Sequence, residues 1–249
     1  MELAGLKSNI RSLQSGLLDL LYPPRCMVCG REGGHPLCSK CLDAARPVPT
    51  PFCNRCMYSS LVEDVTAGCT QCGELKPVFD KVRAPATFES PIRDAVLALK
   101  YGFRESMAQP LGQMMSEYLK SEPFGPETAD LIIPVPLHSS RFRERGFNQS
   151  EALAREVSRG NSIPMSAHAL IRTRRTRPQA SLKLADRRAN VAGAFAVRDV
   201  VEVQGKRVIL IDDVLTTLFT ANECSRVLRE SGAKSIWVLG AAKTCESAE

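Results

Sequence analysis

Four pairs of cysteines, each with two residues between its members, constrain the fold of this 249-residue chain more than any other feature. Two such turns direct four thiolates at one metal ion and complete a tetrahedral Cys₄ site, the arrangement of structural zinc. A closed site leaves no coordination position open, so its zinc folds the segment and does not catalyse. The pattern predicts one or two structural Zn²⁺ ions held by Cys26, Cys29, Cys38, Cys41, Cys53, Cys56, Cys69 and Cys72.

The spacing of the four turns leaves their pairing open. Sequential pairing, first turn with second and third with fourth, is the simpler arrangement, but a cross-braced one is compatible with the same spacing. Redox chemistry of the C-x-x-C motif is the main rival to zinc binding. A disulfide framework is a poor explanation because the rest of the chain has the pattern of an ordinary cytosolic α/β domain.

The composition is that of a globular protein, with 44% hydrophobic and 24% charged residues. No apolar run approaches the ~20 residues that cross a bilayer. The N-terminal residues have helical rather than secretory-signal character. We therefore expect no membrane span and a reducing, cytoplasmic setting.

Positive charge gathers in one part of the chain. Residues 138–190 carry twelve Lys or Arg and four Asp or Glu, whereas the whole chain has a formal net charge of +6. Such a basic stretch suggests a polyanionic partner, for example pyrophosphate, a nucleotide or nucleic acid. The alternative is a solvated helix face, and charge alone does not distinguish the two.

Three units are expected along the chain. Apolar residues recur at helical spacing over residues 8–21, which predicts an amphipathic helix within residues 1–24. The paired cysteines predict a double zinc ribbon over 25–78. The remaining residues, 79–249, alternate between strand and helix patterns, which predicts an α/β domain with a mainly parallel sheet flanked by helices.

Within the α/β domain, short apolar runs predict strands and helical spacing predicts helices. Asn148, with Glu151 three residues on, has the pattern of an N-cap and capping box. Residues 138–147 are expected to form a basic loop, and residues 171–190 a mobile loop that leads into a helical turn. The expected strands are 85–88, 131–136, 191–195, 208–211 and 235–239, and the expected helices are 91–100, 106–119, 149–157 and one from Ala221.

The chain around residues 208–223 has the strongest signature of a ligand site. The expected strand 208–211 is followed by Asp212 and Asp213, then by a threonine-rich turn and a helix. A turn that leads into a helix N-terminus offers free backbone N–H groups to a phosphate, and hydroxyl groups add donors. The two carboxylates suit sugar hydroxyls or an accompanying cation. In the simplest alternative, the aspartates only cap the turn.

This stretch resembles the ribose-phosphate binding motif of the type I phosphoribosyltransferases. The resemblance implies that Asp212 and Asp213 hold the ribose hydroxyls of phosphoribosyl pyrophosphate (PRPP), with Mg²⁺, and that the turn cradles the 5′-phosphate. The family pattern has Gly-Ala where this chain has Leu218-Phe219. Glycine permits a positive φ and close approach to a phosphate. The phosphate-binding candidates are Val214, Leu215, Thr216, Thr217, Leu218, Phe219 and Thr220, with Lys100, Arg141 and Arg145.

A second resemblance covers essentially the whole chain. The segment P-V-P-L-H-S-S-R-F-R-E-R-G-F-N-Q-S, at residues 134–150, is similar to a signature of the ComF/GntX family, and so are the paired cysteines, the L-K-Y-G turn at 99–102 and the Asp-Asp motif. The family combines a double zinc ribbon with a phosphoribosyltransferase-like domain. Its basic loop pattern is matched loosely by Arg172, Gln179, Arg187, Arg188 and Asn190.

The resemblance implies a phosphoribosyl ligand and a link to DNA uptake in competence. If the domain is an enzyme, the expected reaction is phosphoribosyl transfer from PRPP, a glycosyltransferase reaction whose acceptor the sequence does not identify. The alternative is a non-catalytic protein of the same fold that binds single-stranded DNA or DNA-uptake proteins. The basic segment would then follow the phosphate backbone. Leu218 and Phe219 favour binding without turnover, because they replace the Gly-Ala of the family's phosphate-binding turn.

Overall fold

The computed structural model describes residues 24–33, 36–58, 69–101, 104–121, 129–176 and 184–245. The expected amphipathic helix over 8–21 lies outside these ranges, as does Gln179. No helix within the described ranges is both long enough and apolar enough to cross a membrane.

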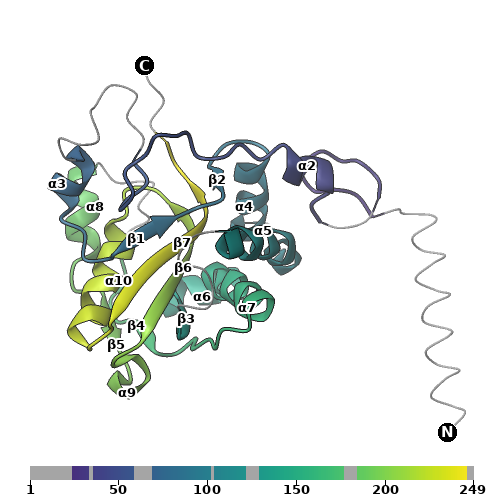
Figure 1. The fold of residues 1–249 in the computed structure, drawn as a ribbon. Helices are drawn as coiled ribbons and strands as arrows, with labels where there is room; N and C mark the ends of the chain where they lie inside the picture. Colours follow the sequence, from purple (N-terminus) through teal and green to yellow (C-terminus); the bar gives the residue numbers. More distant parts are fainter. Residues whose placement is uncertain are drawn as a thin grey trace, which may run out of the picture.

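A parallel sheet organises the α/β domain (Figure 1). Its strands lie in the order β1-β7-β6-β3, and β2 pairs with β7 beyond the end of β1. Each pairing in this sheet is parallel, as the sequence predicts. The strands are β1 (Lys81–Arg83), β2 (Ala86–Thr87), β3 (Leu131–Pro134), β6 (Arg207–Leu215) and β7 (Ser235–Lys243).

Helices cover both faces of this sheet (Figure 1). Side chains alternate between the two faces of a strand, so β6 contributes to two separate cores. Ile209 and Ile211 pack with α4, α5 and α7, whereas Val208 and Leu210 pack with α10. The helices are α4 (Ile92–Tyr101), α5 (Ala108–Ser121), α6 (Ser139–Arg145), α7 (Gln149–Asn161), α8 (Leu184–Val191), α9 (Val200–Val203) and α10 (Phe219–Glu230), with the 3₁₀ turn η1 (Glu105–Met107) before α5.

Small residues allow α5 and α7 to pack closely. A Cβ atom added at Gly112 would collide with the Cβ of Glu156, and one added at Gly160 would collide with the Ser116 hydroxyl. Helix α7 begins at the predicted N-cap, where the Asn148 side chain accepts a hydrogen bond from the backbone N–H of Ser150. The two helices together cover β3, β6 and β7 on one face of the sheet.

The expected basic loop at 138–147 is wrong, because this segment forms helix α6. The imidazole of His138 accepts a hydrogen bond from the Ser140 N–H and caps the helix, and Gly146, with a φ of 78°, ends it. The three arginines of this segment masked the helix in the sequence because the helix has no buried face. Its stability comes from these caps rather than from an apolar stripe.

The expected boundaries between residues 171 and 195 are also wrong. The expected mobile loop begins in strand β4 (Leu170–Arg172), and its residues 177–183 lie outside the described ranges. The helical turn expected at its end is present as α8, which runs to Val191. The expected strand over 191–195 lies further on, as β5 (Phe195–Val197), which pairs antiparallel with β4 in a separate two-stranded sheet. That pairing is between distant segments, so local composition does not reveal it.

The central strand is longer than its apolar run. Strand β6 continues through Asp212 and Asp213 to Leu215, because β7 supplies parallel partners as far as Lys243. The following helix begins at Phe219, not at Ala221. Asp212 and Asp213 therefore lie within strand β6, near its carboxyl end, rather than after the strand. Strand β7 lies inside the sheet, as expected.

Candidate functional site

The eight paired cysteines form two clusters, and the pairing is sequential. The first cluster joins Cys26, Cys29, Cys38 and Cys41, and the second joins Cys53, Cys56, Cys69 and Cys72. Neighbouring sulfurs lie 3.7 and 3.8 Å apart in the first and 3.6 and 3.7 Å apart in the second. A tetrahedron with Zn–S bonds of ~2.3 Å has edges of ~3.8 Å. Both clusters therefore fit structural Zn²⁺, which would hold each ribbon together.

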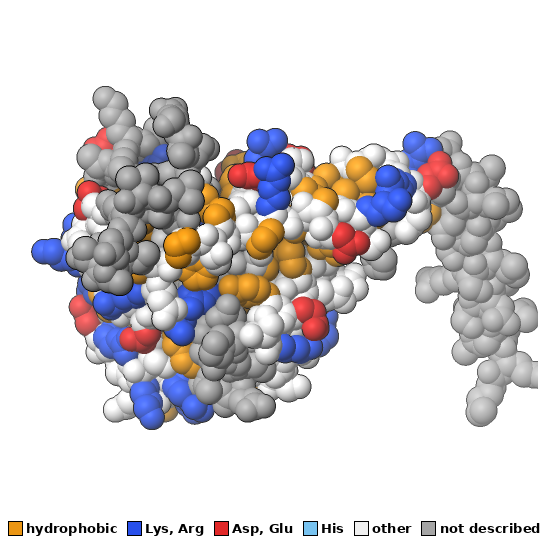
Figure 2. Space-filling model, turned by 45° about the horizontal axis from the view of Figure 1, so that its top comes forward, with side chains coloured by type: hydrophobic (Ala, Val, Ile, Leu, Met, Phe, Trp, Pro, Cys, Tyr) orange, Lys and Arg blue, Asp and Glu red, His pale blue; other side chains and the backbone are white. Residues whose placement is uncertain are grey.

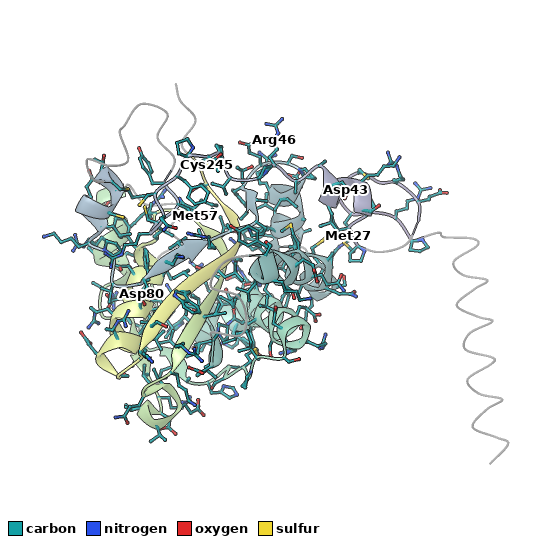
Figure 3. All side chains as sticks on the ribbon, viewed as in Figure 1. Met27, Asp43, Arg46, Met57, Asp80 and Cys245 are labelled. Atoms are coloured by element: carbon teal, nitrogen blue, oxygen red, sulfur yellow. The ribbon has the colours of Figure 1, made fainter. Side chains whose placement is uncertain are left out.

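The two zinc ribbons attach to different cores. The first cluster, with helix α2 (Ser39–Asp43), packs beside α4 and α5 (Figure 1). The second cluster, with helix α3 (Thr70–Leu75), packs against α10. Met57 of the second ribbon lies close to Cys245, which follows β7, at the end of the sheet where β6 and β7 finish (Figure 3). The second ribbon therefore extends to the carboxyl edge of the sheet.

A cleft of about 1140 Å³ opens at this edge. In open parallel sheets, ligands bind outside the carboxyl ends of the strands. Each of the twelve predicted non-cysteine site residues lines this one cleft. Lys100 comes from α4, Arg141 and Arg145 come from α6, and the others come from the end of β6, the start of α10 and the turn between them. Figure 2 brings the top of Figure 1 forward and shows hydrophobic side chains near the middle of this view, with basic and acidic side chains around them.

The acidic pair is held by a short network. Lys100 Nζ lies 2.9 Å from Asp213 Oδ1, and the two side chains are only 19% and 14% exposed. Asp212 Oδ1 accepts hydrogen bonds from the Ser150 hydroxyl at 3.1 Å and from the Asp213 backbone N–H at 2.9 Å. Burial, and then the charge of Asp213, raise the pKa of Asp212 to about 7. Protonation of Asp212 is therefore easier than that of an ordinary aspartate.

The turn after β6 has the backbone shape that the family glycine permits. Leu218 has a φ of 63° and a ψ of 3°, in the left-handed region, and its side chain is only 3% exposed. Its carbonyl accepts the hydrogen bond of the Asn222 N–H, so it begins helix α10. The first N–H groups of a helix have no partner inside the helix. The hydroxyl of Thr217 is buried without a hydrogen-bond partner among the described groups.

Arginines form the basic part of the cleft. Arg145 stacks on the ring of Tyr101 at 5.1 Å and donates to Gln149 at 2.9 Å. Burial, and then the charge of Arg145, lower the pKa of Arg141. The Arg172 guanidinium stacks on the Phe195 ring, 5.1 Å from the ring centroid. Its Nε is buried without a hydrogen-bond partner among the described groups. Positive charges gathered in one cleft repel one another, and an anionic ligand would reduce this repulsion.

Several lining residues were not among the predicted site residues. Ser150, the partner of Asp212, ends the sequence pattern at 134–150, so that pattern was a usable signal. Lys243 follows the expected strand 235–239 and is only 3% exposed. Six others belong to the second zinc ribbon, and no local pattern connects them with the acidic pair: Met57, Tyr58, Thr70, Gln71, Glu74 and Leu75. Arg187 and Arg188 line the cleft as well.

The chain combines two Cys₄ ribbons with a parallel α/β domain, and a cleft lined by two aspartates and several arginines lies at the carboxyl edge of the sheet. This combination defines a class of double-zinc-ribbon proteins. A family model described as a double zinc ribbon domain matches residues 17–74. The DNA utilization protein YhgH of Escherichia coli O157:H7 is 31% identical over 224 residues, covering 88% of this chain and 96% of that protein. Competence protein F of Haemophilus influenzae is 30% identical with the same coverage. The chain belongs to the ComF family.

Two solved structures are also similar to parts of the chain. The glutamine PRPP amidotransferase from B. subtilis has a TM-score of 0.41 and 21% identity, covering 59% of this chain and 30% of that chain. The purine phosphoribosyltransferase from Pyrococcus horikoshii has a TM-score of 0.32 and 17% identity, covering 53% of this chain and 68% of that chain.

Proposed function

We propose that the cleft binds a phosphoribosyl ligand, PRPP with Mg²⁺ or a close relative of it, in a protein that serves the use or uptake of DNA. The observation that supports this most is that the acidic pair, the turn that begins α10 and five arginines line one cleft. A phosphorylated sugar presents hydroxyls and phosphates a few ångströms apart, and these surfaces match those two kinds of group. The names of the relatives, DNA utilization and competence proteins, support the setting.

In this proposal the acidic pair binds the ribose. The Asp212 and Asp213 carboxylates accept hydrogen bonds from the 2′- and 3′-hydroxyls, and their oxygens suit a hydrated Mg²⁺ that also contacts the pyrophosphate. Lys100 now neutralises Asp213 at 2.9 Å. When the ligand binds, a sugar hydroxyl or the cation replaces Lys100 as the partner of Asp213. The ammonium group of Lys100 is then available to a phosphate oxygen.

The turn and the arginines bind the phosphates. Residues 216–220 present the backbone N–H groups of the α10 N-terminus and the unpartnered Thr217 hydroxyl to the 5′-phosphate. Arg141, Arg145 and Arg172 neutralise the pyrophosphate. If an acceptor is bound, its nitrogen forms a bond to the anomeric carbon. The bond to pyrophosphate breaks with the electron pair on the leaving oxygen, and the acceptor proton goes to solvent. The arginines then stabilise the charge of the leaving group.

Calorimetric titration of Mg–PRPP into the zinc-loaded protein tests this proposal. Asp213→Asn removes a charged hydrogen-bond acceptor worth about 1.5–3 kcal/mol, so we expect the affinity to fall about 10- to 100-fold. The matched control is Asp43→Asn, because Asp43 is exposed on α2, at the first zinc ribbon (Figure 3). Absence of binding by the natural protein, or equal affinities for the natural protein and Asp213→Asn, would contradict the proposal.

The second candidate function is binding of single-stranded DNA without catalysis. The basic helix α6 supports it, because Arg141 and Arg145 line the cleft and Arg143 is exposed on the same helix. A backbone-tracking protein loses affinity steeply with salt. We would measure binding of an oligothymidylate by fluorescence anisotropy between 50 and 200 mM salt, roughly the range over which such affinities fall by orders of magnitude. A flat dependence on salt would reject this candidate.

A further inference from the structure

The two zinc clusters differ in what their cysteines pack against. In the second cluster, Cys53 and Cys56 are buried in one hydrophobic core with Leu218, which lies in the turn of residues 216–220 and caps helix α10. The buried cysteines of the first cluster belong to the core on the other face of the sheet. Figure 1 shows α2 of the first ribbon and α3 of the second on opposite sides of the molecule. The second ribbon is therefore the one that shares a core with this turn.

Asn222 joins the second ribbon to the first turn of α10 by hydrogen bonds. Its side-chain oxygen accepts from the Val78 N–H at 2.7 Å, and its side-chain nitrogen donates to the Leu75 carbonyl at 3.3 Å. Leu75 ends α3, three residues after the zinc ligand Cys72. The backbone N–H of Asn222 donates to the Leu218 carbonyl at 2.8 Å. One residue therefore connects the helix that carries a zinc ligand with the turn at the cleft.

The second cluster joins α3 to the segment that carries Cys53 and Cys56. Cys53 Sγ lies 3.7 Å from Cys72 Sγ. Cys56 Sγ lies 3.6 Å from Cys69 Sγ. Thiolates this close repel one another unless a cation binds them. Structural Zn²⁺ contributes directly to the folding of such a ribbon, so the position of α3 depends on whether the cluster holds its ion.

The turn needs support from its surroundings because its left-handed residue is a leucine. Leu218 has a φ of 63° and a ψ of 3°, a conformation that is unfavourable for a residue with a Cβ atom. Such a conformation persists where the surrounding structure fixes it. Here the side chain is only 3% exposed, in the core that it shares with the second ribbon. Without this packing, the contacts that compensate for the strain are lost and the turn changes shape.

We infer that the second zinc ribbon, through Asn222 and the core around Leu218, holds the turn in its anion-binding shape, so that Zn²⁺ at the second cluster and the phosphoribosyl ligand bind cooperatively. Asn222 is a positioning residue, because it does not line the cleft. The coupling is reciprocal: each ligand stabilises the same arrangement of the turn and raises the affinity for the other. The first cluster stays outside this coupling. The inference rests on the proposed function for the identity of the ligand.

Hydrogen–deuterium exchange of the full chain tests the zinc-dependent shape of the turn without any ligand. Cys72→Ser empties the second cluster, and Cys29→Ser empties the first. The N–H groups of residues 222–226 are the first that hydrogen-bond within α10. We expect them to exchange about tenfold faster in Cys72→Ser than in the natural protein, and at an unchanged rate in Cys29→Ser.

The Asn222→Ala variant keeps all eight cysteines, so it tests the connection without removing a zinc ligand. It should retain two zinc ions, and its α10 N–H groups should also exchange faster than in the natural protein. The matched control is Asn161→Ala, because the Asn161 side chain donates to the Ser116 hydroxyl at 2.9 Å and to the Val157 carbonyl, between α5 and α7. Exchange in α10 should not change in this control.

Competition with a chelator that binds Zn²⁺ far more tightly than Mg²⁺ measures the coupling to the ligand. The readout is the zinc content per chain at equilibrium. Saturating Mg–PRPP should raise about tenfold the chelator concentration that removes one of the two ions, and leave the other ion unaffected. Asn222→Ala should reduce this protection to less than about twofold, whereas Asn161→Ala should keep it.

The two proposals fail in different ways. If Mg–PRPP binds but protects neither ion, or protects both ions equally, the coupling is wrong and the phosphoribosyl site stands. Full protection in Asn222→Ala would likewise reject the role of this residue. If Mg–PRPP does not bind, the phosphoribosyl proposal is wrong and the exchange experiment decides alone: equal exchange in Cys72→Ser and in the natural protein would reject the inference.

Discussion

Leu218 offers a test in which two structural effects oppose each other. Its left-handed backbone costs a non-glycine residue about 1–2 kcal/mol. Its side chain, however, is 97% buried beside the second zinc ribbon, and truncation of a buried leucine costs about 2–5 kcal/mol. Burial therefore outweighs strain, and both Leu218→Ala and Leu218→Gly should lower the free energy of unfolding.

The order of the two variants isolates the strain. Glycine relieves the 1–2 kcal/mol of left-handed strain but loses about 0.5–1 kcal/mol through its greater freedom in the unfolded chain. Leu218→Gly should therefore be about 0.5–1 kcal/mol more stable than Leu218→Ala. At Leu228, fully buried within α10, glycine should instead be about 1 kcal/mol less stable than alanine.

Equilibrium unfolding in urea of the zinc-loaded variants measures all four values. The comparison requires that the slope against urea concentration stays the same, so that the midpoints report stability alone. If alanine is as stable as glycine or more stable at position 218, then the left-handed backbone does not strain the leucine, and our account of this turn is wrong.

Three further predictions concern other parts of the structure. The pKa of Asp212 is raised to about 7 in the folded protein, so the contribution of this carboxyl group to stability falls as pH rises from about 4 to 7. Asp212→Asn removes this loss. In urea unfolding it should therefore stabilise the protein more at pH 8 than at pH 5, by on the order of 2 kcal/mol. Cys29→Ser and Cys72→Ser should each reduce the zinc content, measured by a colorimetric assay, from two ions to one per chain. Only Cys72→Ser should weaken Mg–PRPP binding, because the second cluster packs in one core with Leu218, in the turn before α10. Gly112→Ala should lower the free energy of unfolding by about 1–3 kcal/mol, because its Cβ collides with Glu156, whereas Gly73→Ala, whose Cβ meets nothing within 4 Å, should change it by less than about 1 kcal/mol.

The sequence predicts those features that depend on short-range patterns. Two thiols in one C-x-x-C turn must point to the same side, so zinc ligation follows from spacing alone. The buried run in β6 and the N-cap at Asn148 are likewise local. Helix α6 was missed because its caps, rather than an apolar face, define it. Strands β4 and β5 were missed or displaced because their pairing joins distant segments.

The sequence by itself determined which reactive groups this chain carries: eight paired thiols that suit zinc, two adjacent carboxylates at the end of a buried strand, and a basic stretch. Only the tertiary structure decided how these groups are combined. Sequential pairing of the cysteines, the contact between Lys100 and Asp213, and the position of Glu74 in the cleft each depend on contacts between segments far apart in the chain. Such contacts follow from how the two cores pack on either face of the sheet, and packing is a property of the whole fold.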